Sequence, residues 1–175
     1  VGPIVAAKAT RGLAMYDDRI FLATNDARLV ALNAKNGQVG WEKILGDRTN
    51  GAYEAPSGPI VVHGKVIQGL SNCTLYRKEK CFISAYDAKD GRELWRVEER
   101  KHHSGTVRPV VGHGFVYTAT GLAKGELWAV RLGGSGVVTG TNVAWKVTRN
   151  VPNRPSPVLS GDLLFMVDQD GAPET

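Results

Sequence analysis

A motif that occurs twice constrains the fold of this chain more than any other feature. The segment Ala31-Leu-Asn-Ala-Lys-Asn-Gly37-Gln-Val-Gly-Trp41 returns as Ala85-Tyr-Asp-Ala-Lys-Asp-Gly91-Arg-Glu-Leu-Trp95. Each copy has an Asx residue two positions after its first alanine, then a glycine and a final tryptophan. A motif that returns in this way indicates an array of equivalent structural units.

The rest of the chain follows the same period. Short apolar segments begin near Leu13, Ile60, Val110 and Val158, and each is followed by a polar turn and a second apolar segment. These offsets give a period of roughly 48 residues, which is typical of β-propeller blades. We therefore expect one partial propeller over 1–175, with approximate blades at 11–44, 56–99 and 107–148 and a truncated blade at 155–175.

Each complete unit is expected to contain four strands. Third strands are predicted at 29–32, 82–86 and 127–130, where β-branched and aromatic residues are frequent. Fourth strands are predicted at 39–43, 94–97 and 143–147, and no 11-residue window has a helical period. The Asn36-Gly37 and Asp90-Gly91 pairs favour two-residue hairpin turns. The sequence thus predicts an all-β fold, a partial β-propeller of about three and a half four-stranded antiparallel blades.

The predicted fourth strands each carry one tryptophan, Trp41, Trp95 or Trp145. One interpretation is structural, with each ring buried between neighbouring blades and its N–H bonded to a turn carbonyl. The other is a stacking surface for a cofactor. The regular position at the outer strands favours the structural interpretation.

Composition excludes several classes of function. The chain is 42% hydrophobic with 21 glycines, as expected of a turn-rich globular β protein. No apolar run is long enough to span a membrane, and we expect no signal peptide at the start of the chain. The net charge is +5, but basic and acidic residues alternate, as in Arg77-Lys-Glu-Lys80. This pattern argues against a nucleic-acid surface.

The repeated motif resembles the Trp-docking motif of the quinoprotein (PQQ-dependent) alcohol dehydrogenases. Residues 11–96 resemble that family, whereas 105–171 are similar to the broader class of PQQ-like repeat propellers, many of them non-catalytic. In the third unit an insert at 133–142 precedes Trp145. The resemblance implies a propeller of about eight blades, a PQQ cofactor with Ca²⁺ or a lanthanide ion, and a periplasmic location.

The resemblance also implies where cofactor-binding residues would lie. Arg11 matches the family's cofactor-contacting arginine, although a surface or turn-bonding arginine is an equal alternative. Pro56 stands where the family has a threonine, Thr74 where it has a glutamate, and Ala6-Ala-Lys8 where it has a vicinal cysteine pair. No catalytic residue and no metal ligand is carried over to this chain. We expect that the chain alone does not bind PQQ.

Other reactive patterns favour loops over sites. His102 and His103 are adjacent rather than spaced to bind one metal ion. The run Gly133-Gly-Ser-Gly136 lacks the Lys-Ser/Thr pair of a phosphate-binding loop.

Cys73 and Cys81 are the only cysteines and are predicted to form a disulfide. They bracket a short insert between two predicted antiparallel strands, whose ends lie within bridging distance. A disulfide would indicate an oxidising compartment such as the periplasm. The alternative is two free buried thiols.

Two functions remain open from the sequence. The chain is either a fragment of a PQQ-dependent alcohol dehydrogenase, inactive alone, or a non-catalytic PQQ-like repeat module that serves as a scaffold or protein-binding surface. In both cases the end blades would leave sheet faces and edges uncovered. We therefore expect self-association, or contact with the remaining blades of a longer chain.

Overall fold

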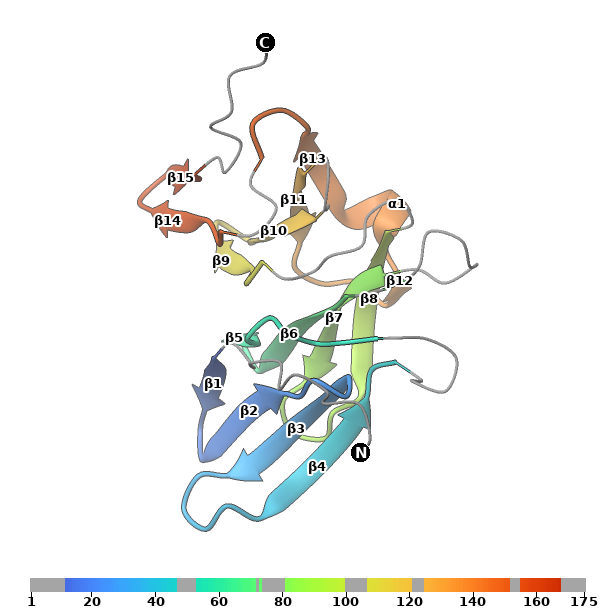
Figure 1. Ribbon diagram of the computed structural model, residues 1–175, viewed down its shortest axis with the longest axis vertical. Coiled ribbons are helices and arrows are strands. Elements are labelled where there is room, and N and C mark those ends of the chain that lie inside the picture. The colour runs from blue at the N-terminus through green and yellow to red at the C-terminus, as the bar shows by residue number, and fades with distance from the viewer. Residues whose placement is uncertain are drawn as a thin grey trace, which may run out of the picture.

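The computed structural model describes residues 12–46, 53–71, 73, 81–99, 107–120, 125–151 and 155–167. Sheets follow one another along the chain and form a curved array (Figure 1). The first sheet, blade 1, contains β1 (Leu13–Tyr16), β2 (Arg19–Ala23), β3 (Arg28–Asn33) and β4 (Val39–Ile44). Its strands lie in sequence order and every neighbouring pair is antiparallel. The predicted class, a partial propeller of four-stranded antiparallel sheets, is confirmed.

Three further sheets complete the array. Blade 2 contains β5 (Ile60–Val62), β6 (Lys65–Leu70), β7 (Cys81–Asp87) and β8 (Glu93–Glu99). Blade 3 contains β9 (Val110–Gly112), β10 (Phe115–Thr120), β11 (Glu126–Arg131) and β13 (Val143–Val147), and blade 4 is the hairpin β14 (Val158–Ser160) and β15 (Leu163–Phe165). The first strands β1, β5, β9 and β14 lie along one side of the array in Figure 1, and β4, β8 and β13 lie along the other.

The turns between third and fourth strands differ from the sequence prediction. In blade 1 the Asn33 N–H donates to the Gln38 carbonyl at 2.8 Å, so the loop has four residues, 34–37. The Asn33 side chain accepts a hydrogen bond from the Lys35 N–H at 2.9 Å, which closes an Asx-turn at the start of the loop. Gly37 then adopts a φ of +72°. The predicted two-residue turn is wrong because the side chain of Asn33, three positions before Asn36, lengthens the loop.

The hydrophobic core lies between the blades rather than within one sheet. In blade 2, Val66 and Tyr86 pack against blade 1, whereas Ile67 and Ala85, the next residues on each strand, pack against blade 3. Side chains alternate across a strand, so a sheet with neighbours on both sides buries both of its faces. A third cluster joins blades 3 and 4.

The end sheets leave apolar side chains exposed. In the described part of the chain, blade 2 has no exposed large apolar side chain, because a four-stranded blade packs against each of its faces. The exposed ones are Leu13, Met15, Tyr16, Val39 and Ile44 in blade 1, Trp145 and Val147 in blade 3, Val158, Leu163, Phe165 and Val167 at blade 4, and Val137 in the insert of blade 3. This distribution is what an incomplete ring of blades presents at its two ends.

No described helix has the length and apolar character needed to cross a membrane.

Candidate functional site

The contact between blades 1 and 2 centres on Trp41. Its indole N–H donates to the Ala88 carbonyl at 3.1 Å, and its ring covers Gly91, which has a φ of +73°. A Cβ placed on Gly91 would lie 2.7 Å from Cε3 of Trp41, so the ring needs a glycine beneath it. Arg19 donates to the same Ala88 carbonyl at 2.9 Å. The repeated motif therefore supplies both halves of a joint: a tryptophan to the next blade, and a turn that receives one from the blade before.

Blades 1 and 3 carry the same elements without partners in the described residues. In blade 1 the turn around Ala34 and Gly37 is exposed, and a Cβ on Gly37 would meet no atom within 4 Å. In blade 3, Trp145 is 42% exposed and its indole N–H donates to no described residue. Its ring contacts Tyr117, with 5.8 Å between the centroids. The chain thus presents an uncovered receiving turn on blade 1 and an undocked tryptophan on blade 3.

Blades 2 and 3 are joined in a different way. Trp95 is completely buried, yet its indole N–H has no hydrogen-bond partner among the described residues. The turn of blade 3 that would receive it is replaced by the insert at 133–142. The insert contains β12 (Gly136–Val137) and a single helical turn, α1 (Thr139–Asn142), which the sequence did not indicate.

The insert acts as a main-chain clasp on blade 2. Strand β12 adds to β8 as a fifth strand, parallel to it, with Gly136 opposite Trp95. The Val138 N–H then donates to the Arg96 carbonyl at 2.9 Å, and the Glu98 N–H donates to Oγ1 of Thr139 at 2.8 Å. The outer edge of blade 2 is therefore paired by residues from blade 3.

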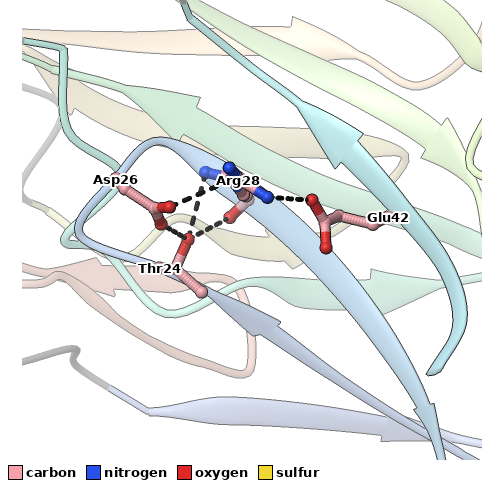
Figure 2. Close-up of polar contacts among 4 residues, drawn as sticks. All are labelled: Thr24, Asp26, Arg28 and Glu42. Atoms are coloured by element: carbon pink, nitrogen blue, oxygen red, sulfur yellow. Dashed lines mark hydrogen bonds and ion pairs between the residues drawn. The ribbon is translucent and has the colours of Figure 1, made fainter. Parts of the chain in front are cut away.

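A polar cluster at the turn between β2 and β3 fixes the shape of blade 1 (Figure 2). Arg28 Nε lies 2.9 Å from a carboxylate oxygen of Asp26, and its Nη1 bonds to Glu42 on β4. Oγ1 of Thr24 accepts a hydrogen bond from the Arg28 N–H at 3.2 Å. The hydrogen bond that Arg28 donates to Glu42 and the charges of Glu42 and Asp26 raise the pKa of Arg28. Because two carboxylates neutralise this cation, the cluster has a structural role.

The two cysteines form the predicted pair. A disulfide joins Cys73 to Cys81, with 5.3 Å between the Cα atoms. Both side chains are buried in the core between blades 1 and 2. The disulfide therefore ties the connection from β6 to β7 to a packed part of the molecule.

A groove of about 570 Å³ runs along the first strands of blades 2, 3 and 4. Its walls are apolar except for Arg108 and Ser156. Sequence reasoning missed Arg108 because Arg-Pro reads as the start of a strand. A signal was present, since Arg108 stands two residues before β9 as Arg11 stands two residues before β1.

Few of the positions that the resemblance assigns to the cofactor site lie among the described residues. Arg11, Thr74 and the His102-His103 pair lie outside the described residues. Pro56 lies at the entry to blade 2 and offers no side-chain donor. Within the described ranges no three His, Cys, Asp or Glu side chains gather closely enough to hold a metal ion.

Comparison with known proteins identifies the repeat. A family model of PQQ-like repeats, described as outer membrane protein assembly factor BamB, matches residues 4–172. Among curated proteins, the quinoprotein alcohol dehydrogenase PedH of Pseudomonas putida is 37% identical over 97 residues, which are 55% of this chain and 16% of PedH. The quinoprotein ethanol dehydrogenase of Pseudomonas aeruginosa is 34% identical over 124 residues, 67% of this chain and 19% of that protein. The chain thus spans less than a fifth of either relative.

Solved structures show the same fold. The quinohemoprotein alcohol dehydrogenase ADHIIG of Pseudomonas putida HK5 matches 80% of this chain and 26% of its own with a TM-score of 0.65 at 18% identity. BamB from Moraxella catarrhalis matches 87% of this chain and 41% of its own, with a TM-score of 0.57 at 16% identity. The computationally designed Ika4 protein matches 97% of this chain and 89% of its own, with a TM-score of 0.63 at 14% identity. The chain, with its docked Trp41 and its stacked four-stranded sheets, therefore belongs to the PQQ-like repeat family of β-propeller proteins.

Proposed function

We propose that the chain supplies blades to the propeller of a PQQ-dependent alcohol dehydrogenase-like protein and does not form a complete catalytic site by itself. The observation that carries this proposal is the placement of the unsatisfied joints. The turn of blade 1 is uncovered and Trp145 of blade 3 is undocked, whereas the joint between blades 1 and 2 is complete at Trp41. The identity of 37% over 97 residues with the quinoprotein alcohol dehydrogenase PedH supports the same assignment.

The chain alone is proposed not to bind PQQ with useful affinity. Arg11 is the one residue carried over from the family's site, and one exposed ion pair contributes about 1 kcal/mol or less. Micromolar binding needs about −8 kcal/mol. Calorimetric titration of the chain with PQQ and Ca²⁺ or a lanthanide should give no saturable binding, and a dye-linked assay with ethanol should show no turnover. A dissociation constant below about 10 µM, or roughly −7 kcal/mol, would overturn this proposal.

The open ends are proposed to associate with other blades, either in a second copy or in the remainder of a longer chain. Sedimentation velocity of the 175-residue chain over a tenfold concentration range should show self-association. Charged substitutions on the end faces, Met15→Asp in blade 1 and Phe165→Asp in blade 4, should each weaken it. Arg131→Asp, on an exposed residue away from both end faces, is the matched control. A monodisperse monomer at every concentration would contradict the proposal of self-association.

The proposed location is the periplasm or another compartment outside the cytoplasm. The disulfide between Cys73 and Cys81 supports it, because structural disulfides persist in oxidising compartments. Fractionation of host cells, followed by immunoblotting, should place the protein in the periplasmic fraction. Recovery in the cytoplasmic fraction with free thiols would contradict this location.

A second candidate function is a non-catalytic module that acts as a scaffold or protein-binding surface. The insert favours it, because the third unit loses the receiving turn of the motif and gains a clasp instead. The BamB description of the matching family model points the same way. Expression of the entire open reading frame distinguishes the two functions. PQQ-dependent oxidation of ethanol supports the dehydrogenase, and a folded full-length protein without PQQ binding supports the module.

A further inference from the structure

The groove along the first strands of blades 2, 3 and 4 has the features of a ligand site. We propose that it binds a small organic carboxylate with a planar apolar body, and that Arg108 holds the carboxylate group. This proposal goes beyond the proposed function, since it concerns neither PQQ nor alcohol oxidation. It would also hold if the chain were a non-catalytic module.

The shape and the lining of the groove favour an apolar ligand body. Its volume of about 570 Å³ lies within the usual range for small-molecule sites. Strands β5, β9 and β14 contribute valine, isoleucine and leucine side chains to its walls, together with two prolines. The innermost strands of a propeller surround its central channel, where ligands have access to several blades at once. A flat apolar group therefore has a surface to lie against.

Arg108 is held in place from both sides. Its Nη2 donates to the Pro59 carbonyl of blade 2 at 3.2 Å, and its backbone N–H donates to Oγ of Ser156, next to blade 4, at 3.0 Å. A guanidinium has five N–H donors, so most of them stay available to a ligand. Because the Ser156 oxygen acts as an acceptor here, its hydroxyl proton is also available for donation. The two polar groups of the groove are thus both donors to an anion.

Arg28 and Arg96 of the described chain are paired with carboxylates, whereas Arg108 is not. Arg28 pairs with two carboxylates, and Arg96 makes two hydrogen bonds to the carboxylate of Glu93, at 2.7 and 2.5 Å. No carboxylate in the described part of the chain pairs with Arg108, whose side-chain hydrogen bond goes to a neutral carbonyl. The planar fork of a guanidinium matches the two oxygens of a carboxylate. An unpaired arginine beside an apolar wall therefore selects a carboxylate that carries an apolar group.

The probe for the test is 2-naphthoate, titrated into the 175-residue chain and followed by the methyl NMR signals of Val110, Val111 and Val158. We expect a dissociation constant on the order of 1 mM, as one exposed charge pair and partial apolar contact allow. Arg108→Gln should weaken binding about tenfold, because a charge-assisted hydrogen bond is lost. Arg108→Lys should give an intermediate value. Arg131→Gln removes an exposed arginine of the same blade outside the groove and should leave the affinity unchanged.

The neutral analogue 2-naphthamide separates the carboxylate contact from the apolar contact. It should bind the parent chain and Arg108→Gln equally, and more weakly than 2-naphthoate binds the parent. The proposal is overturned if Arg108→Gln binds 2-naphthoate as tightly as the parent, or if Arg131→Gln weakens it equally. It is also overturned if the shifted methyl signals lie outside β5, β9 and β14. If Arg108→Gln does not fold, the Lys variant and the comparison of naphthoate with naphthamide decide. The PQQ titration is a separate experiment at micromolar concentration, so either result can fail without the other.

Discussion

The two glycines of the repeated motif provide a matched pair for measuring the Trp41 joint. Gly37 and Gly91 occupy equivalent turns, and their φ angles are +72° and +73°. The environments differ, because a Cβ on Gly37 would meet no atom within 4 Å, whereas one on Gly91 would lie 2.7 Å from Cε3 of Trp41. Alanine at either position carries the same backbone strain, so the difference between the two substitutions reports the packing of the tryptophan.

The expected magnitudes follow from these contacts. Alanine in the left-handed region costs about 1–2 kcal/mol, which should be the whole effect of Gly37→Ala. Gly91→Ala also displaces the Trp41 ring. The hydrogen bond to Ala88, 3.1 Å long, is then lost at about 1 kcal/mol. The ring contact with Phe21, 5.8 Å between centroids, weakens by about 1 kcal/mol more. We therefore expect Gly91→Ala to destabilise the fold by about 2 kcal/mol more than Gly37→Ala.

Urea denaturation, followed by circular dichroism, measures both free energies of unfolding, with the m-value as a check that the unfolded states are alike. A double-mutant cycle completes the experiment. In a Trp41→Ala background, the difference between the two glycine substitutions should fall to within about 0.5 kcal/mol of zero. Equal effects of Gly37→Ala and Gly91→Ala in the parent chain, or a difference that persists without Trp41, would refute the assignment of this joint to the tryptophan.

Three further perturbations test other parts of the molecule. Thr139→Ala removes the acceptor of the Glu98 amide, so it should destabilise the chain by about 1 kcal/mol and speed hydrogen exchange at that amide. Thr139→Ser, which keeps the hydroxyl, is the control. Unchanged exchange in the Ala variant would contradict the pairing of the insert with blade 2. Reduction of the Cys73–Cys81 disulfide should lower the free energy of unfolding by about 2–3 kcal/mol in urea titrations with and without reductant, and equal curves would contradict this. Burial raises the pKa of Tyr86. The unfolded chain releases this proton near pH 10 and the folded chain retains it, so stability should fall with pH above about pH 10, and Tyr86→Phe should remove this slope.

The sequence predicts the strands well because their pattern is periodic. Val66 and Ile67, or Tyr86 and Ala85, are all apolar because both faces of an internal blade are buried. This burial produces continuous apolar runs at regular intervals, which the sequence displays directly. The Trp41 contact is also predictable, since the motif names both the ring and the glycine that it covers.

The clasp and the groove could not be predicted in the same way. Strand β12 has two residues, and its pairing with β8 depends on backbone groups that any residue provides. The insert at 133–142 therefore interrupts the repeat period, and its sequence has no pattern that identifies β8 as the strand it pairs with. The position of Arg108 matters only in the folded chain, where blades 2, 3 and 4 meet at the groove. No local sequence pattern distinguishes it from another arginine. The Asn36-Gly37 pair misled because the Asn33 side chain determines the loop.

The pairing of the insert with β8 can form only after the ribosome has made blade 3. Glu98 and Thr139, which close it, are separated by 41 positions. At about 5–20 residues per second, the ribosome needs about 2–8 s to add that many residues. During this interval β8 is already made while its covering strand is not, so its backbone groups form an open edge that another nascent chain can pair with. On a polysome, where identical chains emerge close together, the outer edge of blade 2 is therefore open to co-translational mispairing until the insert of blade 3 arrives.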